Sequence, residues 1–430
     1  MSRFDTDRLH AGYNPADHNN AVAVPIYQTA AFEIGTVKRS DDMFSFDDFD
    51  PLYTRLSNPT SDVLNERLAK LHNATGAISL GSGMAAVTYS LLNVAETGGH
   101  IVAIPRLYGG SVDSFTQIFS KLNIEVSLVD DPDDISQFER EIKDNTKAIY
   151  IESITNPNAT VLDIEEIAKV AHKNGIPLIV DNTLATPYLL NPFDYGADVV
   201  VYSATKALAG HGNVIAGAVV ENGKFNWANG KFPQFTETPY FLQGQDGKPR
   251  SVLDIFGDAP FTGRINAIHL NYLGAVISPF DAFLVLTGIE TLSERVAKQV
   301  KNAEAIVEFL EGREEVLWVK HPHAKANPYA DLARKYLPKG AGGILSFGLK
   351  GSKEQREKFL ESTEVFSFQA NIGDAKSLII NPSNTTHIEL NPQLQEKADI
   401  LPETIRLSLG LEDIEDLIED LERAFKKANI

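Results

Sequence analysis

Short apolar runs alternate with helical stretches between residues 77 and 220, and this alternation limits the possible folds more than any other feature. The runs are bounded by turn-forming residues and are too short for helices, which is typical of strands buried in a parallel sheet. They are Ala77–Leu80, Ile101–Ile104, Ile124–Val129, Ala148–Ile151, Leu178–Val180, Val199–Tyr202 and Val214–Val220. The sequence therefore predicts an α/β fold whose mostly parallel, seven-stranded sheet is flanked by helices.

The segments on either side of these runs predict two further parts. Residues 1–61 are polar with little periodicity, so we expect an extended N-terminal arm. The sheet would occupy residues 62–289, and a smaller α+β C-terminal domain would follow over 290–430. Apolar residues at three- and four-residue steps predict a helix over 292–310, and another helix is expected over 412–426.

Composition excludes several classes of protein. Asp and Glu number 58 against 39 Lys and Arg, a net charge of −19, whereas a nucleic-acid surface needs a basic footprint. The absence of cysteine excludes disulfides, thiolate nucleophiles and cysteine-ligated zinc, and we predict no metal site. The first residues have no apolar core of a signal peptide. The most apolar stretch, residues 273–289, is interrupted by Pro279 and Asp281. We therefore expect a cytoplasmic protein without a nucleic-acid or membrane partner.

Candidate functional residues follow three of the predicted strands. Gly81-Ser82-Gly83-Met84 comes after the first strand and leads into a helical pattern, an arrangement that can bind an anion but is often only a helix cap. Asp181 follows the fifth strand, and Lys206 lies in the loop after the sixth. The carboxyl ends of parallel strands meet at one edge of a sheet, so these residues should lie close together.

A lysine, a carboxylate and a phosphate-binding turn at one edge match the needs of pyridoxal 5'-phosphate (PLP). The cofactor forms a Schiff base with a lysine, here Lys206, and its ring nitrogen pairs with an acidic group, here Asp181. The alternative is a plain ion pair between the two side chains. Tyr202 and Lys206 also have the four-residue spacing of the Tyr-Lys pair in short-chain dehydrogenases. In those enzymes the pair lies on a helix and a glycine fingerprint follows the first strand. Here the pair spans the end of a predicted strand, and the sequence has no such N-terminal fingerprint.

Six motifs in order make the chain resemble the Cys/Met-metabolism PLP enzymes of fold type I. They are YTRLSNPT at 53–60, SGMAA at 82–86, LYGG at 107–110, VDNTLATPYL at 180–189, the SATK…GHG segment at 203–212 and IRLSLGLED at 405–413. The resemblance covers essentially the whole chain. It implies the transferase fold of that family, and it implies a role for each matching residue.

For the cofactor, the resemblance implies that Ser203, Thr205 and the backbone N–H groups of Gly83 and Met84 hold the phosphate. Tyr108 would stack on the pyridine ring and assist proton transfer, while Lys206 would act as the base after its displacement. Tyr53 and Arg55 would reach the phosphate from a neighbouring subunit, so a homo-oligomer is implied. We expect a tetramer built from two dimers that share active sites. Simple core packing of Tyr53 and Tyr108 is the alternative.

For the substrate, the resemblance implies that Arg406 binds the α-carboxylate through its rigid, two-pronged guanidinium. Asn156 would contact the substrate or the cofactor, and Ser377 belongs to a region near the substrate carboxylate. A structural ion pair is the alternative for Arg406. His211 follows the lysine closely, but we expect a structural role for it.

Within the family, the chain resembles the O-acetylhomoserine sulfhydrylase branch. The long excursion predicted over 221–265 contains KFNWANGKFPQFTETPY at 224–240, which is similar to an insertion of that branch. The implied reaction joins O-acetyl-L-homoserine with sulfide or a thiol and releases acetate. Met84 and Asn381 depart from the glutamine and histidine that are common in this branch. The alternatives are a cystathionine γ-synthase, a γ-lyase of the same family, or a non-catalytic protein that keeps the fold.

Overall fold

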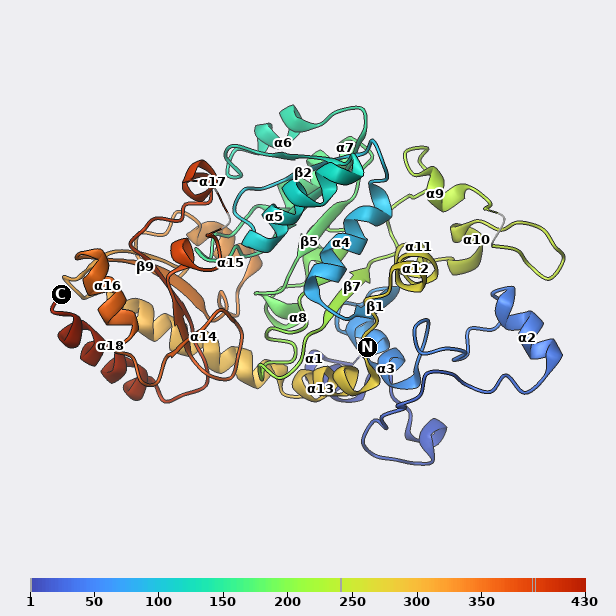
Figure 1. Cartoon of the computed structure of the whole chain (residues 1–430), viewed down its shortest axis with the longest axis horizontal. Coiled ribbons are helices and arrows are strands. Elements are labelled where there is room, and N and C mark those ends of the chain that lie inside the picture. Colours follow the sequence, from blue (N-terminus) through green and yellow to red (C-terminus); the bar gives the residue numbers. More distant parts are fainter. Residues whose placement is uncertain (1, 240–241, 389, 391) are drawn as a thin grey trace.

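The computed structural model describes residues 2–239, 242–388, 390 and 392–430, and its core is a seven-stranded sheet (Figure 1). Each strand coincides with one of the seven apolar runs, so the predicted α/β fold is confirmed. The strands are β1 Gly76–Leu80, β2 His100–Ala103, β3 Glu125–Leu128, β4 Thr146–Glu152, β5 Leu178–Asp181, β6 Val199–Tyr202 and β7 Gly217–Glu221.

The strand order β1-β7-β6-β5-β4-β2-β3 places the last strand of the sheet between the first and the sixth. Strand β7 is antiparallel to both β1 and β6, whereas the other neighbouring strands are parallel. The carboxyl ends of β1, β2, β4, β5 and β6 therefore lie along one edge. This edge is where ligands bind in open α/β sheets.

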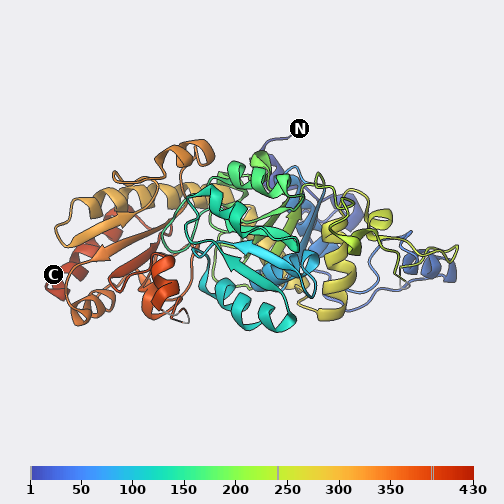
Figure 2. The same ribbon diagram turned by 90° about the horizontal axis from the view of Figure 1, so that it is seen from above.

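Helices cover both faces of the sheet (Figure 2), which explains why its strands are apolar on both sides. All four residues of β6, for example, are buried. Helix α3, Pro59–Leu71, precedes β1. The helices between the strands are α4 Gly83–Val94, α5 Gly109–Gln117, α6 Ile135–Glu141, α7 Ile164–Lys173 and α8 Thr186–Leu189.

The excursion after β7 forms its own aromatic cluster. Trp227 stacks on Phe235 with 4.5 Å between ring centroids and lies 5.2 Å from Phe261. The predicted excursion is confirmed, although Tyr240 within it lies outside the described residues. The helices here are α9 Pro233–Thr236, α10 Val252–Phe256, α11 Pro260–Arg264, α12 Asn271–Leu273 and α13 Pro279–Ile289.

A second, five-stranded sheet with the order β10-β11-β12-β9-β8 forms the core of the C-terminal part. Its strands are β8 Val316–Lys320, β9 Ile344–Leu349, β10 Ser367–Phe368, β11 Leu378–Ile380 and β12 Thr404–Ser408. The helices are α14 Leu292–Glu311, α15 Ala330–Tyr336, α16 Lys353–Leu360, α17 Pro392–Lys397 and α18 Ile414–Ala428. The two predicted helices of this region correspond to α14 and α18.

Helix α14 connects the two cores. Leu292 and Val296 near its start belong to the apolar core of the large sheet, whereas Ile306 and Leu310 near its end pack under the second sheet. One amphipathic helix thus fixes the position of the second sheet relative to the first. The predicted domain boundary before residue 290 falls just ahead of this helix and stays a prediction.

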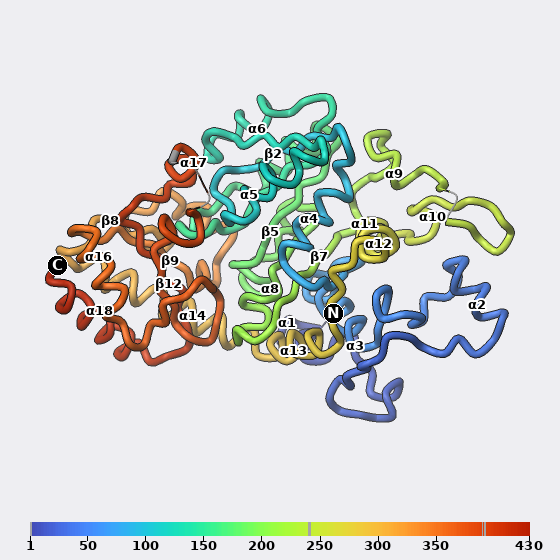
Figure 3. The backbone as a smooth tube through the Cα atoms, in the orientation of Figure 1, coloured from blue at the N-terminus to red at the C-terminus, as the bar shows by residue number. Residues whose placement is uncertain are grey.

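The N-terminal arm is only partly extended. Helix α1, Phe4–His10, packs on α3, and Arg8 donates to Glu294 at 2.5 Å, which anchors the first turn to the body. Beyond α1 the chain runs outward through α2, Val37–Phe44, and returns to α3 (Figure 3). Its tip packs on the excursion, where Arg250 donates to Asp47 at 3.0 Å. Among the described residues, no helix is long and apolar enough to cross a bilayer.

Candidate active site

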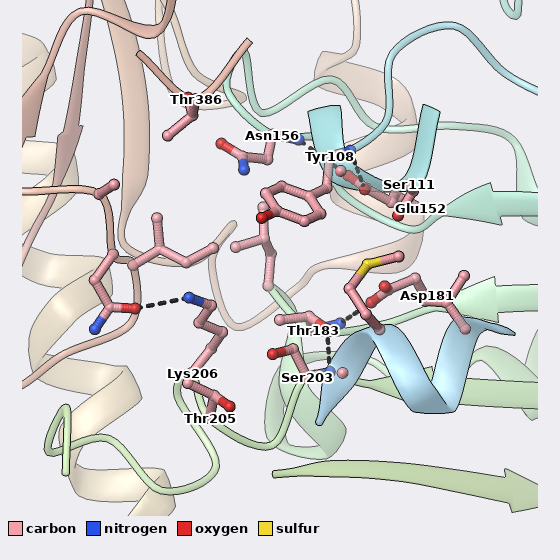
Figure 4. A pocket seen from close by; sticks show the side chains of 18 of the residues that line it. Tyr108, Ser111, Glu152, Asn156, Asp181, Thr183, Ser203, Thr205, Lys206 and Thr386 are labelled. Carbon is pink, nitrogen blue, oxygen red and sulfur yellow. Dashed lines mark hydrogen bonds between the residues drawn. The ribbon is translucent and has the colours of Figure 1, made fainter. Parts of the chain in front are cut away.

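A cavity of about 610 Å³ lies at the carboxyl edge of the large sheet. The residues that follow β1, β2, β4, β5 and β6 line one side. The C-terminal part lines the other side with residues 370–372, 385 and 386, and Arg406 of β12. Figure 4 shows side chains from both parts pointing into the same space. The expectation that the strand-end residues share one edge is therefore met for Asp181 and Lys206.

The glycine turn after β1 forms one end of the cavity. Ser82 caps α4, since its Oγ accepts from Ala85 N at 3.1 Å, and the first N–H groups of a helix have no intrahelical partner. Gly83 lies against the loop that carries Lys206, because a Cβ on it would stand 2.6 Å from Ser203 Cβ. Gly83, Met84, Ser203 and Thr205 all line the cavity, an arrangement suited to a phosphate.

Asp181 lies at the end of β5 and is held by its neighbours. Its carboxylate accepts from Thr183 N at 2.9 Å and faces the Tyr150 hydroxyl at 3.4 Å. Burial raises the pKa of Asp181, while the hydrogen bonds from Thr183 and Tyr150 lower it. A carboxylate in such a dry setting gains most by facing a cation, which a protonated ring nitrogen would supply.

Lys206 extends from the loop after β6 toward the C-terminal part. Its Nζ donates to Asn371 Oδ1 at 2.7 Å, a bond drawn in Figure 4. Burial and the positive charge of Arg406 lower the pKa of Lys206 to about 8, with Asp374 opposing them. A lysine with so low a pKa keeps a substantial neutral fraction near neutrality, as nucleophilic attack on an aldehyde requires.

Arg406 is 2% exposed and lines the cavity from β12. Its Nη1 donates to Asn156 Oδ1 at 3.1 Å and its Nη2 to the backbone oxygen of Asn371 at 3.0 Å. Its buried Nε has no hydrogen-bond partner among the residues that the structure describes. A buried guanidinium with an unused N–H calls for an anionic ligand such as a carboxylate.

Tyr108 presents an exposed ring to the same cavity at the start of α5. Its backbone N–H donates at 2.6 Å to Glu152, the last residue of β4. The ring lies between the Asn156 side and the Asp181 side in Figure 4. This position suits an aromatic that stacks on a planar ring bound between Asp181 and Lys206.

Three of the predicted residues lie outside the cavity of their own chain. Tyr53, 41% exposed, and Arg55 lie in the arm, where the guanidinium of Arg55 stands 5.1 Å from the Tyr53 ring. Ser377 is fully buried and donates to Glu412 at 2.8 Å, which leaves its hydroxyl engaged in the C-terminal core. The roles of all three stay predictions.

Tyr202 and His211, the two residues near Lys206 for which no cofactor role was expected, also lie outside the cavity lining. Tyr202 is buried away from the cavity, where its hydroxyl contacts Asn182 Nδ2 at 2.9 Å and His72 Nε2 at 2.8 Å. It does not share the cavity with Lys206, so the dehydrogenase interpretation fails. His211 is exposed and contacts the Ala209 carbonyl at 2.6 Å, outside the cavity lining.

The described residues thus offer a phosphate cradle, a carboxylate for a ring nitrogen, a nucleophilic amine and an anion-binding arginine. Residues 5–426 match the family described as Cys/Met metabolism PLP-dependent enzyme. The chain belongs to this family. PLP is its cofactor.

Members of the PLP family with curated names are similar along their whole length. An O-acetyl-L-homoserine sulfhydrylase of Leptospira meyeri is 40% identical over 98% of this chain and 96% of its own. A homocysteine synthase of Schizosaccharomyces pombe is 38% identical over 99% and 98%. A solved Campylobacter jejuni structure, named as an O-acetylhomoserine (thiol)-lyase, superposes with a TM-score of 0.94 at 37% identity. It covers 99% of this chain and all of its own, and it contains a pyridoxyl-lysine monophosphate.

Two residues of this PLP site escaped the sequence analysis, Asn371 and Glu152. Asn371 touches both Lys206 and Arg406, yet it is far from both in sequence. Glu152 directly follows the predicted run Ala148–Ile151, as Asp181 follows Leu178–Val180, so the rule that found Asp181 would also have found Glu152. For Asn371, by contrast, the sequence order gives no signal.

The pKa of Lys206 gives a prediction for cofactor uptake by the cofactor-free protein. Its amine is protonated below about pH 8 and neutral above it, so the rate of aldehyde capture should fall as the pH drops through 8. The rate is read from the absorbance that appears when PLP is added across a pH series. A midpoint near the usual lysine value of 10.5 would contradict this, and Lys206→Ala, as the control, should give no band.

Proposed function

We propose that the protein catalyses a γ-replacement in which O-acetyl-L-homoserine and sulfide, or a thiol, give L-homocysteine, or its thioether, and acetate. The Cγ–O bond breaks and its electron pair leaves with acetate. The Cγ–S bond forms from a sulfur lone pair, and the proton of the thiol stays in solution. The observation that carries the proposal is the unused Nε of Arg406, a residue that lines the same cavity as Lys206. The names of the full-length relatives support the same reaction.

In this reaction PLP supplies an electron sink for the pair released when a C–H bond at Cα breaks. Arg406 would bind the α-carboxylate and so orient the amino acid in the cavity. The amine of Lys206 would take the proton from Cα and then a proton from Cβ, and its lowered pKa suits both transfers. Asp181 would pair with the protonated ring nitrogen, and Tyr108 would stack on the ring.

The charges around the cavity favour an acetyl leaving group. The lining contains two cationic side chains, Lys206 and Arg406, and three acidic ones, Asp113, Glu152 and Asp181. Both cations are occupied in the proposed mechanism. A succinyl or phosphoryl group would bring further negative charge without a cation in the described lining, and Asp113 would repel it.

A family γ-lyase or cystathionine γ-synthase would use the same residues and is the second candidate. The relatives named above support it less. The chain also lacks cysteine, which the methionine γ-lyase branch typically has next to the ring-stacking tyrosine. The lyase reaction ends in 2-oxobutyrate rather than homocysteine, so the products distinguish the two.

The position of Tyr53 and Arg55 supports an oligomer that shares its sites. Both side chains are exposed on the arm and do not line their own cavity. The arm also exposes Val37, Phe44 and Phe49, which a monomer would leave in water. We propose a homodimer in which each arm reaches the phosphate end of its partner's cavity, and a tetramer of two such dimers. The cytoplasmic location stays a prediction.

The first prediction of this proposal concerns the acceptor. With O-acetyl-L-homoserine, homocysteine should form when sulfide is added and should be absent without it, as measured by chromatography of the products. Lys206→Ala should lose turnover by at least about 10³-fold, because both the cofactor link and the proton carrier disappear. Release of 2-oxobutyrate without sulfide would move the protein to the lyases.

A second prediction concerns the acyl group. O-succinyl-L-homoserine should have a kcat/KM at least about tenfold below that of the acetyl ester, since one uncompensated like-charge contact in the cavity is worth about 1.4 kcal/mol or more. Asp113→Asn should narrow this difference by improving the succinyl ester alone. Equal use of both esters by the unmodified enzyme would refute the charge argument, and Asp133→Asn, outside the cavity lining, is a matched control.

A third prediction tests the shared site. Lys206→Ala and Arg55→Ala homo-oligomers should each be impaired, but mixing and reassembling the two should restore activity. One of the two sites in each hybrid dimer then has both an intact Lys206 and an intact partner arm. No gain over the separate variants, in a mixture shown by mass to contain hybrids, would place Arg55 in its own subunit's site or in none.

A further inference from the structure

Glu152 ties together two loops at the edge of the cavity. It is the last residue of β4, pairs in register with Asp181 of β5, and is 5% exposed. One carboxylate oxygen accepts from Tyr108 N at 2.6 Å, and the other accepts from Asn156 N at 3.1 Å. The first bond holds the loop after β2, and the second holds the loop after β4. Figure 4 shows Glu152 beside Tyr108 and Ser111.

Each of these loops carries a side chain that faces the cavity. Tyr108 is the N-cap residue of α5, and its side chain makes no capping hydrogen bond to that helix. Asn156 receives the Nη1 hydrogen bond of Arg406 at 3.1 Å. The carboxylate of Glu152 therefore binds the backbone N–H of the two residues whose side chains are the aromatic ring and the partner of the arginine.

A carboxylate is suited to this arrangement because both of its oxygens only accept hydrogen bonds. Glutamine could accept one of the two N–H groups, but its own NH₂ would then face the other. Burial and the nearby charge of Asp181 raise the pKa of Glu152, while the N–H groups of Tyr108 and Asn156 lower it. Burial beside Asp181 is unfavourable for a charged carboxylate, and the hydrogen bonds from Tyr108 and Asn156 offset this cost. Loss of either bond leaves a buried polar group unpaired.

Glu221 provides a structural comparison within the same sheet. It is the last residue of β7 and 1% exposed, and it accepts from Phe261 N at 3.1 Å and Thr262 N at 2.6 Å. It thus ties one backbone segment to a strand end just as Glu152 does. It does not line the cavity.

We propose that Glu152 is a positioning residue that sets the ring of Tyr108 and, through Asn156, the guanidinium of Arg406 in their working positions. The inference rests on the proposed roles of Tyr108 and Arg406. A single buried carboxylate then links coverage of the cofactor ring to recognition of the substrate carboxylate. Glu152 itself need not touch the substrate.

The first test uses hydrogen exchange of the cofactor-free protein, measured by mass spectrometry, and does not depend on activity. Glu152→Gln should speed exchange in peptides covering residues 107–112 and 153–158. Glu221→Gln, the matched control, should leave these peptides unchanged and speed exchange around 258–263. Unchanged exchange at both cavity loops in Glu152→Gln would overturn the inference.

The second test measures ligand binding to the PLP-loaded protein through its absorbance. The probes are L-norvaline, an amino acid without a leaving group, and butylamine, the same chain without the carboxylate. Glu152→Gln should weaken norvaline about tenfold, the loss expected when a charged hydrogen-bond network is broken, and should weaken butylamine clearly less, because butylamine has no carboxylate for Arg406. Glu221→Gln should bind both as the unmodified protein does. Equal weakening of both probes, or the same loss in Glu221→Gln, would refute a positioning role.

Asn156→Ala keeps the test decisive if Glu152→Gln does not fold. It leaves Glu152 and both backbone hydrogen bonds in place but removes the link to Arg406. It should therefore weaken norvaline alone while the cavity loops keep their slow exchange. Unchanged norvaline binding in this variant would overturn the proposed link. If the unmodified protein gave no absorbance band with PLP, the proposed function would fail, while the exchange result on Glu152 would stand separately.

Discussion

The contact between the glycine turn after β1 and the lysine loop after β6 is the constraint on which the site depends. Strand β7 lies between these two strands and is antiparallel to both, so β1 and β6 point the same way. Their carboxyl ends are therefore only one strand apart at the same edge of the sheet. The fit leaves no room for side chains. A Cβ on Gly217 would stand 2.0 Å from the Ser82 oxygen, and one on Gly83 would stand 2.6 Å from Ser203 Cβ. A phosphate site and an amine are thereby fixed to one rigid framework.

The electrostatics of the cavity follow from how deeply these groups are buried. Burial raises the pKa of Asp181 and Glu152 and lowers the pKa of Lys206 to about 8 and of Arg406 to about 10. Each group on its own is therefore less ready to carry its charge than it would be in water. A bound cofactor with a cationic ring and an anionic phosphate, and a substrate carboxylate, would supply the opposite charges. The buried charges of the site would therefore gain their partners only when the cofactor and the substrate bind.

The sequence predicts the part of this design that lies on the large sheet. Apolar runs identify the strands, and because parallel strands end at one edge, Asp181 and Lys206 could be placed together from spacing alone. The roles of Tyr108, Asn156 and Arg406 came only from family resemblance, and the structure brings all three to the cavity. The helix α1 was missed because its stability comes from packing on α3 rather than from a periodic pattern of its own.

What the sequence could not predict is the meeting of the two sheets, and Asn371 illustrates why. Its side-chain oxygen accepts from Lys206 of the first sheet, and its backbone oxygen accepts from Arg406 of the second. The packing of α14 against both cores brings these groups together, and such packing leaves no local signature in sequence. Because one residue accepts hydrogen bonds from both the amine and the guanidinium, Asn371 joins the Lys206 loop of the first sheet to strand β12 of the second at the cavity.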